Sequence, residues 1–302
     1  MNRDSPVRPL TAGDAVPLWT LLASRSPHAH DCGAEALAES LAGGRFTGLV
    51  AGHGGDLAGA LVLETIPSVY TGRRWGHLDD VVVTGRREAV AKALVDEALR
   101  TLEEAGVSDT SVAVPAGDDA VERACRRCGY GDEQLILLRR DAGDTSRAAS
   151  PAHVLVRPAE TGDAESIAGL VRLFAGEYGE VSAADAASVT AYLQHPGVDA
   201  LLAFSKDAVV GLLACSVSFR PWSGGSCATI DDLVVRPDAR RRGVATALIG
   251  QALAGFRRTG SDRRVSLWLQ DGNDAAMRLY RSWGFRPVGT LLIRHGSAAS
   301  GA

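Results

Sequence analysis

Hydrophobic residues recur along this chain with two different spacings, one typical of strands and one typical of helices. The order of these spacings along the chain predicts the order of its strands and helices. In residues 227–235 (CATIDDLVV), apolar residues stand close together around two aspartates, as in a partly buried strand. In residues 244–256 they recur every three or four positions, as on the buried face of a helix. Similar patterns predict strands at 200–205 and 265–269 and a helix over 273–283. We therefore expect the α/β fold class, with a twisted mixed sheet flanked by helices.

The same order of predicted elements occurs twice in the sequence. The tripeptide Val7–Pro9 recurs as Val156–Pro158, an offset of 149 residues, and Gly129-Tyr130 is matched by Gly284-Phe285, an offset of 155. An internal repeat of this length predicts two tandem domains of one kind. The helix-period residues are Ala91, Leu94, Val95, Ala98, Leu99 and Leu102 in the first copy and Ala245, Leu248, Ile249, Ala252, Leu253 and Phe256 in the second.

The composition between the copies sets the expected domain boundaries. Residues 142–152 are small and polar and include a Ser-Pro, which is typical of a linker. The first domain is then 1–141 and the second 153–295, and we expect residues 296–302 to be a disordered tail.

Two local expectations concern the second copy. A last strand pair within 285–294 is expected to close its sheet. Ser182 is expected to cap a helix that runs to about Leu193, where a His-Pro pair follows.

Charge and cysteine content narrow the classes of partner. The net charge is −4 over 302 residues, whereas a dedicated nucleic-acid binder would usually be strongly basic. Five cysteines do not form a disulfide framework, and the first ten residues lack the apolar core of a secretory signal. The longest apolar run, 200–219, is broken by Lys206 and Asp207, so no membrane span is expected. We expect a cytoplasmic protein.

A basic, glycine-containing turn precedes the best-defined helix. The first amides of a helix have no internal partners, and the helix dipole adds partial positive charge there. Gly243 lets a ligand's phosphates approach the backbone, so the turn predicts an anion-binding site. The alternative is an ordinary turn with solvated arginines. The residues of this turn are Arg240, Arg241, Arg242, Gly243, Val244, Ala245 and Thr246.

Several motifs of the second copy occur together in one known family. Arg240, Gly243 and Ala245 match an Arg/Gln-x-x-Gly-x-Gly/Ala turn, and the later helix carries Asn273 and Tyr280 before Gly-Phe. In these motifs, and in the order of its elements, residues 154–294 resemble the GNAT superfamily of acetyl-CoA-dependent N-acetyltransferases. The whole chain then resembles a tandem GNAT protein.

The resemblance implies where acetyl-CoA would bind. Its pantetheine arm would lie along Leu233, Val234 and Val235 like an added strand, and Asn273 would hydrogen-bond the arm from the other side. Its pyrophosphate would meet the basic turn from Arg240 to Thr246. The amine would attack the thioester directly, and no metal is implied. Cys215 and Cys227 have no histidine close by in sequence, so we interpret both as core residues.

The resemblance also implies two proton transfers. Asp231 stands where several such enzymes carry a carboxylate base, which would deprotonate the amine through a water. Tyr280 matches the family's proton donor to the leaving thiolate. The alternatives are a structural carboxylate and a core tyrosine. Strand alternation places Asp232 on the opposite face from Asp231, unless a bulge changes the parity.

The acceptor site is the least defined part of the sequence. In the resemblance, the region between the first two helices, the strand hairpin and the fifth strand wall the acceptor pocket. Acidic and aromatic residues there would suit a cationic amine, although an ordinary polar loop explains them equally well. The candidate substrate-binding residues are Glu177, Tyr178, Glu180, Phe219, Trp222, Asp232 and Trp268.

The first copy departs from this pattern. Ala89 replaces the glycine of the turn, Asp118 the asparagine and Cys125 the tyrosine, although Asp79-Asp80 repeats the two aspartates. A side chain in the turn and an added negative charge both oppose phosphate binding. We therefore expect a catalytically inert first domain.

The expected function is transfer of acetyl from acetyl-CoA to a primary amine of a small molecule. The first domain would serve as a scaffold or as the surface of a homodimer. A mycothiol-synthase-like enzyme, an antibiotic-modifying enzyme, an acetylase of proteins and a non-catalytic acetyl-CoA-binding module all remain open.

Overall fold

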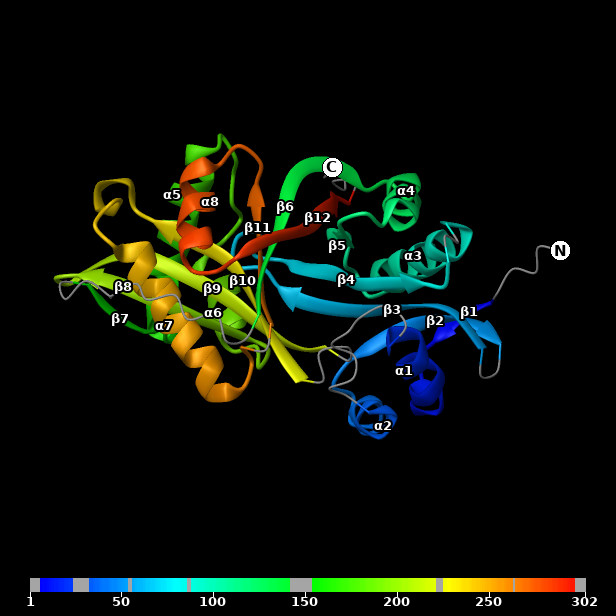
Figure 1. The fold of residues 1–302 in the computed structure, drawn as a ribbon. Coiled ribbons are helices and arrows are strands. Elements are labelled where there is room, and N and C mark those ends of the chain that lie inside the picture. The colour runs from blue at the N-terminus through cyan, green and yellow to red at the C-terminus, as the bar shows by residue number, and fades with distance from the viewer. Residues whose placement is uncertain are drawn as a thin grey trace.

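The computed structural model describes residues 6–23, 33–53, 56–85, 88–141, 154–220, 225–262 and 264–296. The expected linker, the expected tail beyond Gly296, and Trp222 lie outside these ranges. The expected fold class is confirmed, because the described residues form a mixed sheet with helices packed on it (Figure 1).

One sheet of twelve strands runs through the described residues, in the order β1-β2-β3-β4-β5-β12-β6-β11-β10-β9-β8-β7. Neighbouring strands are antiparallel except for β4 with β5 and β10 with β11, which are parallel. The strands are β1 (Val7–Pro9), β2 (Thr47–His53), β3 (Asp56–Pro67), β4 (Arg74–Val83), β5 (Thr110–Pro115), β6 (Gly131–Asp141), β7 (Leu155–Pro158), β8 (Val198–Ser205), β9 (Ala208–Arg220), β10 (Gly225–Val235), β11 (Arg264–Gln270) and β12 (Arg286–Arg294).

The helices follow the predicted periodicity. All six helix-period residues named for the first copy are buried in α3, and those of the second copy are buried in α7 except Ala245. The expected cap at Ser182 is wrong, because Asp185 caps the next helix by accepting a hydrogen bond from Ser188 N at 2.7 Å. The helices are α1 (Ala15–Ala23), α2 (Ala34–Ala42), α3 (Glu88–Glu104), α4 (Asp119–Arg127), α5 (Ala164–Glu177), α6 (Ala186–Leu193), α7 (Val244–Thr259) and α8 (Asp274–Ser282).

The two repeats exchange their last strands. β6, from the first repeat, pairs with β11, while β12, from the second, pairs with β5, and the two exchanged strands pair with each other (Figure 1). The cores follow the same exchange, since Leu138 packs in the second repeat's core and Leu292 in the first. The expectation that 285–294 closes the second repeat's own sheet is therefore wrong. Exchange pairs the edges that β5 and β11 would otherwise expose.

Candidate active site

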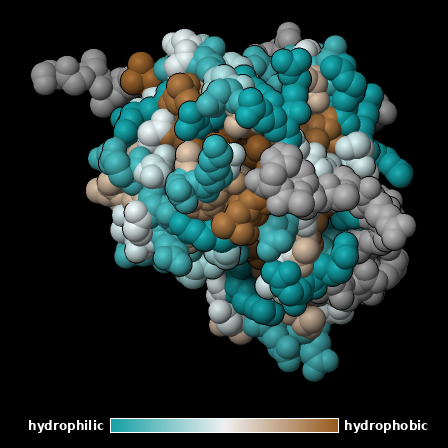
Figure 2. All heavy atoms as spheres, turned by 90° about the vertical axis from the view of Figure 1, so that its left-hand side faces the viewer, coloured by the Kyte–Doolittle hydropathy of each residue, from teal (hydrophilic) through white to brown (hydrophobic). Residues whose placement is uncertain are grey.

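A groove of about 1040 Å³ opens between β10 and β11. These strands pair in parallel only where Ala228–Ile230 faces Val265–Leu267. Beyond this point β10 stays paired with β9 as far as Val235, and β11 stays paired with β6 as far as Gln270. The two backbones diverge, which leaves room for an extended ligand between them. Figure 2 views the molecule from the end where β7, β8 and α7 lie, and shows apolar surface in hollows between hydrophilic ridges.

The basic turn lies at one end of this groove. Gly243 is the residue before α7 and has φ = 82°, in the left-handed region that glycine adopts without steric cost. Arg241 also has a positive φ, 58°, which is strained for a residue with a side chain. Both line the groove together with Arg240 and with Val244, Ala245 and Thr246 of the first helical turn, but Arg242 does not. The unpaired amides at the start of α7 can therefore receive an anion.

An ion pair lies beside the turn. Arg240 pairs with Glu177, the last residue of α5, and both residues line the groove. The Arg240 Nε group also donates to the carbonyl oxygen of Val235 at 3.0 Å. The Arg240 guanidinium at the edge of the groove is thus engaged by a carboxylate with which a ligand's phosphates would compete.

The strand residues proposed for the pantetheine arm alternate in direction. The Leu233 and Val235 side chains line the groove, whereas Val234 is 3% exposed and packs in the core on the other face of the sheet. Any contact of Val234 with a ligand must come from its backbone. On the other side of the groove, Asn273 caps α8 through its side-chain oxygen, which accepts from Ala276 N at 3.1 Å. Its amide NH₂ can still donate.

A β-bulge places two carboxylates in the groove. Ile230 is opposite Cys215 and Asp232 opposite Ala214, so Asp231 is an extra residue on β10. Both Asp231 and Asp232 line the groove. The expectation of opposite faces from simple alternation is therefore wrong here, and the bulge is its physical cause.

Burial alters the acidity of both carboxyls. Burial and the neighbouring charge of Asp232 raise the pKa of Asp231 well above its usual range. Burial raises the pKa of Asp232 to about 6. Asp231 Oδ1 accepts a hydrogen bond from Ser216 Oγ at 3.1 Å, while Oδ2 is buried without a partner in the described residues. Asp231 therefore has an acceptor that a ligand or water can use.

Tyr280 projects from α8 into the same groove. It is 7% exposed and packs edge-on against Phe285, with ring centroids 5.8 Å apart. Burial and the charge of Asp232 raise the pKa of its hydroxyl above the usual tyrosine value. The group stays protonated at neutral pH and can serve as a proton donor.

Not all of the candidate substrate-binding residues lie in the groove. Glu177, Tyr178, Glu180 and Trp268 line the groove. Phe219 does not: its ring stacks on Phe46 of the first repeat, with centroids 5.7 Å apart.

The groove also contains residues that the sequence did not indicate. Tyr70, from the β3–β4 connection, lines it and donates a hydrogen bond to Glu180, and Leu135 lines it from the exchanged strand β6. Phe174 of α5 lies between the rings of Tyr70 and Tyr178, with centroids 6.1 and 5.1 Å away. Tyr70 and Leu135 belong to the first repeat, so no motif of the second repeat points to them.

In the first repeat, the helix start that corresponds to the basic turn carries ion pairs. Ala89, the counterpart of Gly243, lies inside α3, and Glu88 is the first residue of that helix. The Glu88 carboxylate pairs with Arg123 at 3.0 Å and Arg127 at 2.8 Å, both on α4. An acidic side chain thus occupies the helix start to which a phosphate would bind in the second repeat.

Cys125 and Cys128 have the Cys-x-x-Cys spacing that some metal sites use. Burial raises the pKa values of the Cys125 and Cys128 thiols to about 12, which disfavours the thiolate that binds metals. The described residues contain no group of three or more His, Cys, Asp or Glu side chains suited to a metal ion. None of their helices is long and apolar enough to cross a membrane.

Residues 164–285 match the family described as acetyltransferase (GNAT) family. The second repeat thus contains a GNAT-family domain. This domain is that of an acyltransferase, and the matched residues contain the bulge, the basic turn and Tyr280. No curated protein sequence matches the chain.

Solved structures share the fold over nearly the whole chain, and one of them is described as a tandem GNAT protein. A GCN5-related N-acetyltransferase from Sphaerobacter thermophilus is 18% identical, with a TM-score of 0.59 and coverage of 98% of each chain. A tandem GNAT protein from the clavulanic acid biosynthesis pathway is 17% identical, with a TM-score of 0.56 and coverage of 98% of this chain and 99% of that chain. A Drosophila protein is 13% identical, with a TM-score of 0.56 and coverage of 97% and 99%. At these identities the likeness concerns the fold.

Proposed function

We propose that the groove of the second repeat binds acetyl-CoA and transfers its acetyl group directly to a primary amine of a small molecule. The observation that carries this proposal is the groove itself, which extends from the Gly243 helix start to a bulge bearing Asp231 and Asp232, with Tyr280 lining it from α8. Its volume of about 1040 Å³ leaves room for an extended carrier, and groups that could transfer protons line it.

The chain offers acetyl-CoA three kinds of contact. The amides from Arg241 to Thr246 and the Arg240 guanidinium would hold the pyrophosphate. The backbone of 233–235 would pair with the pantetheine arm where β10 has left β11. Asn273 would donate its amide NH₂ to the arm from α8.

The acceptor amine must lose a proton before it attacks. A primary amine has an ordinary pKa of roughly 10.4, so it arrives as an ammonium ion. Asp231 has a buried oxygen without a partner in the described residues and, in its ionised form, would accept this proton through a water. The amine lone pair then attacks the thioester carbonyl. The departing sulfur has a pKa of roughly 8.5 by analogy with cysteine, and Tyr280 would protonate it. The nitrogen loses its second proton as the amide forms, and this proton would restore the Tyr280 hydroxyl through solvent.

We further propose that the first repeat has no acetyl-transfer activity of its own. The pairing of Glu88 with Arg123 and Arg127 supports this proposal, because it satisfies the cations at that helix start with an internal carboxylate. Asp118 adds a second negative charge at the start of α4.

The direct test is an assay of CoA release from acetyl-CoA by the full chain. The acceptor panel contains arylalkylamines, amino acids, polyamines, aminoglycosides, a cysteinyl pseudo-disaccharide and peptides. We expect amine-dependent release with at least one small amine, and its loss in Gly243→Glu. Tight acetyl-CoA binding without release on any acceptor would contradict the proposal and favour a non-catalytic binding module.

A further inference from the structure

A second cavity joins the groove at its bulged end and is built by both repeats. Its volume is about 150 Å³, and it meets the groove at Tyr70, Asp231, Asp232 and Trp268. The first repeat supplies residues 66–71, which run from the end of β3 into the β3–β4 connection, together with residues of β4 and β5. Here we name this cavity the inter-repeat chamber. Its other lining residues are Trp75, His77, Ser111, Tyr192, Leu291 and Ile293.

The walls of the inter-repeat chamber are mainly apolar or aromatic, and their polar groups are already paired. His77 Nδ1 and Ser111 Oγ hydrogen-bond each other at 2.7 Å, and burial lowers the pKa of His77 to about 4, so its ring is neutral. The Tyr192 hydroxyl donates to the carbonyl oxygens of Asp199 and Cys215, at 3.5 and 3.4 Å. Because these polar groups already have hydrogen-bond partners, they do not require a polar group on the ligand.

The two carboxyls at the inner end are the exception. Asp231 Oδ2 lacks a partner in the described residues. Asp232, with its pKa of about 6, is ionised at pH 7. A cationic group that enters from the chamber would therefore meet negative charge where the thioester is expected, and the Trp268 ring beside it offers an aromatic face.

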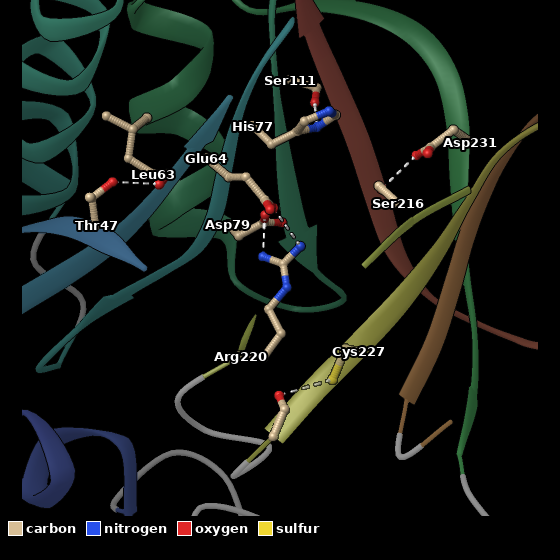
Figure 3. A network of polar contacts seen from close by, with 11 residues as sticks. Thr47, Leu63, Glu64, His77, Asp79, Ser111, Ser216, Arg220, Cys227 and Asp231 are labelled. Carbon is tan, nitrogen blue, oxygen red and sulfur yellow. Dashed lines mark hydrogen bonds and ion pairs between the residues drawn. The ribbon is translucent and has the colours of Figure 1, made fainter. Parts of the chain in front are cut away.

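The charge of the walls also excludes some ligands. No arginine or lysine is among the described residues that line the inter-repeat chamber. Arg220 lines an adjoining cavity, but this guanidinium is engaged by Glu64 and Asp79 (Figure 3). An acceptor with a carboxylate next to its amine would bring that charge close to Asp231 and Asp232 with no cation in the wall to balance it.

We propose that the acceptor is a compact primary amine on an aromatic or aliphatic body, without an acid group beside the amine, and that its body lies in the inter-repeat chamber. This inference rests on the proposed acetyl transfer. The volume agrees with such a body, because an apolar protein cavity of about 150 Å³ binds benzene. The first repeat then acts as half of the acceptor site although it has no active site of its own.

The first experiment compares matched amines with the full chain and acetyl-CoA. The series is 2-phenylethylamine, L-phenylalaninol and L-phenylalanine, in which the last adds a carboxylate, together with spermidine and kanamycin. We expect kcat/KM for 2-phenylethylamine and phenylalaninol to exceed that for phenylalanine at least about 100-fold, as expected for an uncompensated like charge in a partly desolvated site. Preference for phenylalanine, spermidine or kanamycin would overturn the inference but leave acetyl transfer intact. No release with any amine would instead refute the proposed function.

The second experiment tests the wall that the first repeat contributes. Thr71 lines the chamber at its partly exposed rim, so Thr71→Arg places a cation there without opening the core. It should raise kcat/KM for phenylalanine about tenfold or more relative to 2-phenylethylamine and leave the KM for acetyl-CoA unchanged. Thr20→Arg, on the exposed face of α1, should leave the ratio as it is. An unchanged ratio in folded Thr71→Arg would show that this wall does not contact the acceptor.

Discussion

Asp79 of β4 is the repeat counterpart of Asp231 of β10, yet their surroundings are opposite. Asp79 forms an ion pair with Arg220 of β9, which links the two repeats (Figure 3). Asp231 has a hydroxyl as its hydrogen-bond partner and a buried oxygen without one in the described residues. The aspartate at this position of the repeat therefore joins the two repeats in the first copy and lines the groove in the second.

Asp231→Asn should stabilise the protein at neutral pH. Because the folded-state pKa of Asp231 is raised, the native protein keeps a proton that the unfolded chain releases above about pH 3.9. Native stability therefore falls as pH rises from there through the folded-state pKa, by about 1.4 kcal/mol for each pH unit that separates the unfolded and folded pKa values. Asparagine removes this loss. Urea unfolding from pH 5 to 8 should show an advantage of the variant that grows with pH.

The matched control for that series is Asp163→Asn. Arg157 lowers the pKa of Asp163, so its stabilising effect is present above the unfolded pKa and is lost as pH falls. This variant should be less stable than the parent at neutral pH, with a difference that shrinks in acid. A constant, pH-independent penalty in Asp231→Asn would contradict the raised pKa.

Asp232→Asn should shift the acidic limb of the plot of kcat/KM against pH to lower pH. The charge of Asp232 helps to raise the pKa of Asp231. Its removal should lower that pKa, so kcat/KM for the amine should begin to rise at a lower pH, although its maximum should fall. Asp238→Asn, an exposed aspartate paired with Arg236, should leave the limb in place. A limb that does not move in Asp232→Asn would remove Asp231 as the group that controls it.

Gly243→Glu should weaken acetyl-CoA binding at least about 100-fold by calorimetry. The substitution places a carboxylate at an anion-binding helix start and a side chain where φ is 82°. Gly260→Glu, at the other end of α7 with φ = 70°, carries a similar backbone strain of roughly 1–2 kcal/mol. It should lose stability but retain affinity. Equal affinities for the two variants would place the phosphates elsewhere.

Tyr280→Phe should lower kcat about 100-fold, in the range of a lost general acid, with little change in the KM for acetyl-CoA. Circular dichroism and melting would check that the buried ring still packs on Phe285. Tyr130→Phe, at the first-repeat counterpart of Phe285 and 3% exposed, removes a similar buried hydroxyl away from the groove. Its kcat should match the parent. Full activity in Tyr280→Phe would exclude this hydroxyl from proton transfer.

Glu177→Gln should tighten acetyl-CoA binding about three- to tenfold. The substitution removes the carboxylate that pairs with Arg240 and competes with the ligand's phosphates. The gain should diminish in high salt, because the pair is partly exposed and is screened. Glu165→Gln breaks an ion pair with Arg172 elsewhere on α5 and should not change the affinity. Weaker binding in Glu177→Gln would instead show that Glu177 holds Arg240 in place for the ligand.

The sequence predicted those features that depend on neighbouring residues. The helix periodicity identified the buried face of α3 completely, because that face is set by residues three and four apart. The turn before α7 could be located because Gly243 and the arginines are adjacent in the chain.

Features that depend on distant pairing could not be predicted in this way. β12 has the same hydrophobic pattern whether it joins its own repeat or the other, so its partner β5 was not visible. Alternation also could not reveal the extra residue at Asp231, because a bulge depends on the register with β9. Phe219 was assigned to the pocket because it is aromatic, but its partner Phe46 lies in the first repeat.

The crossed strands β6 and β12 also determine what can be removed from this protein. A fragment cut at the linker would keep the basic turn and the bulge but would lose the strand that supports β11, together with the chamber wall from the β3–β4 connection. Two copies of such a fragment could restore the lost pairing by lending each other their final strands. The tandem chain is thus equivalent to a strand-swapped dimer joined into one polypeptide, in which each partner was free to specialise.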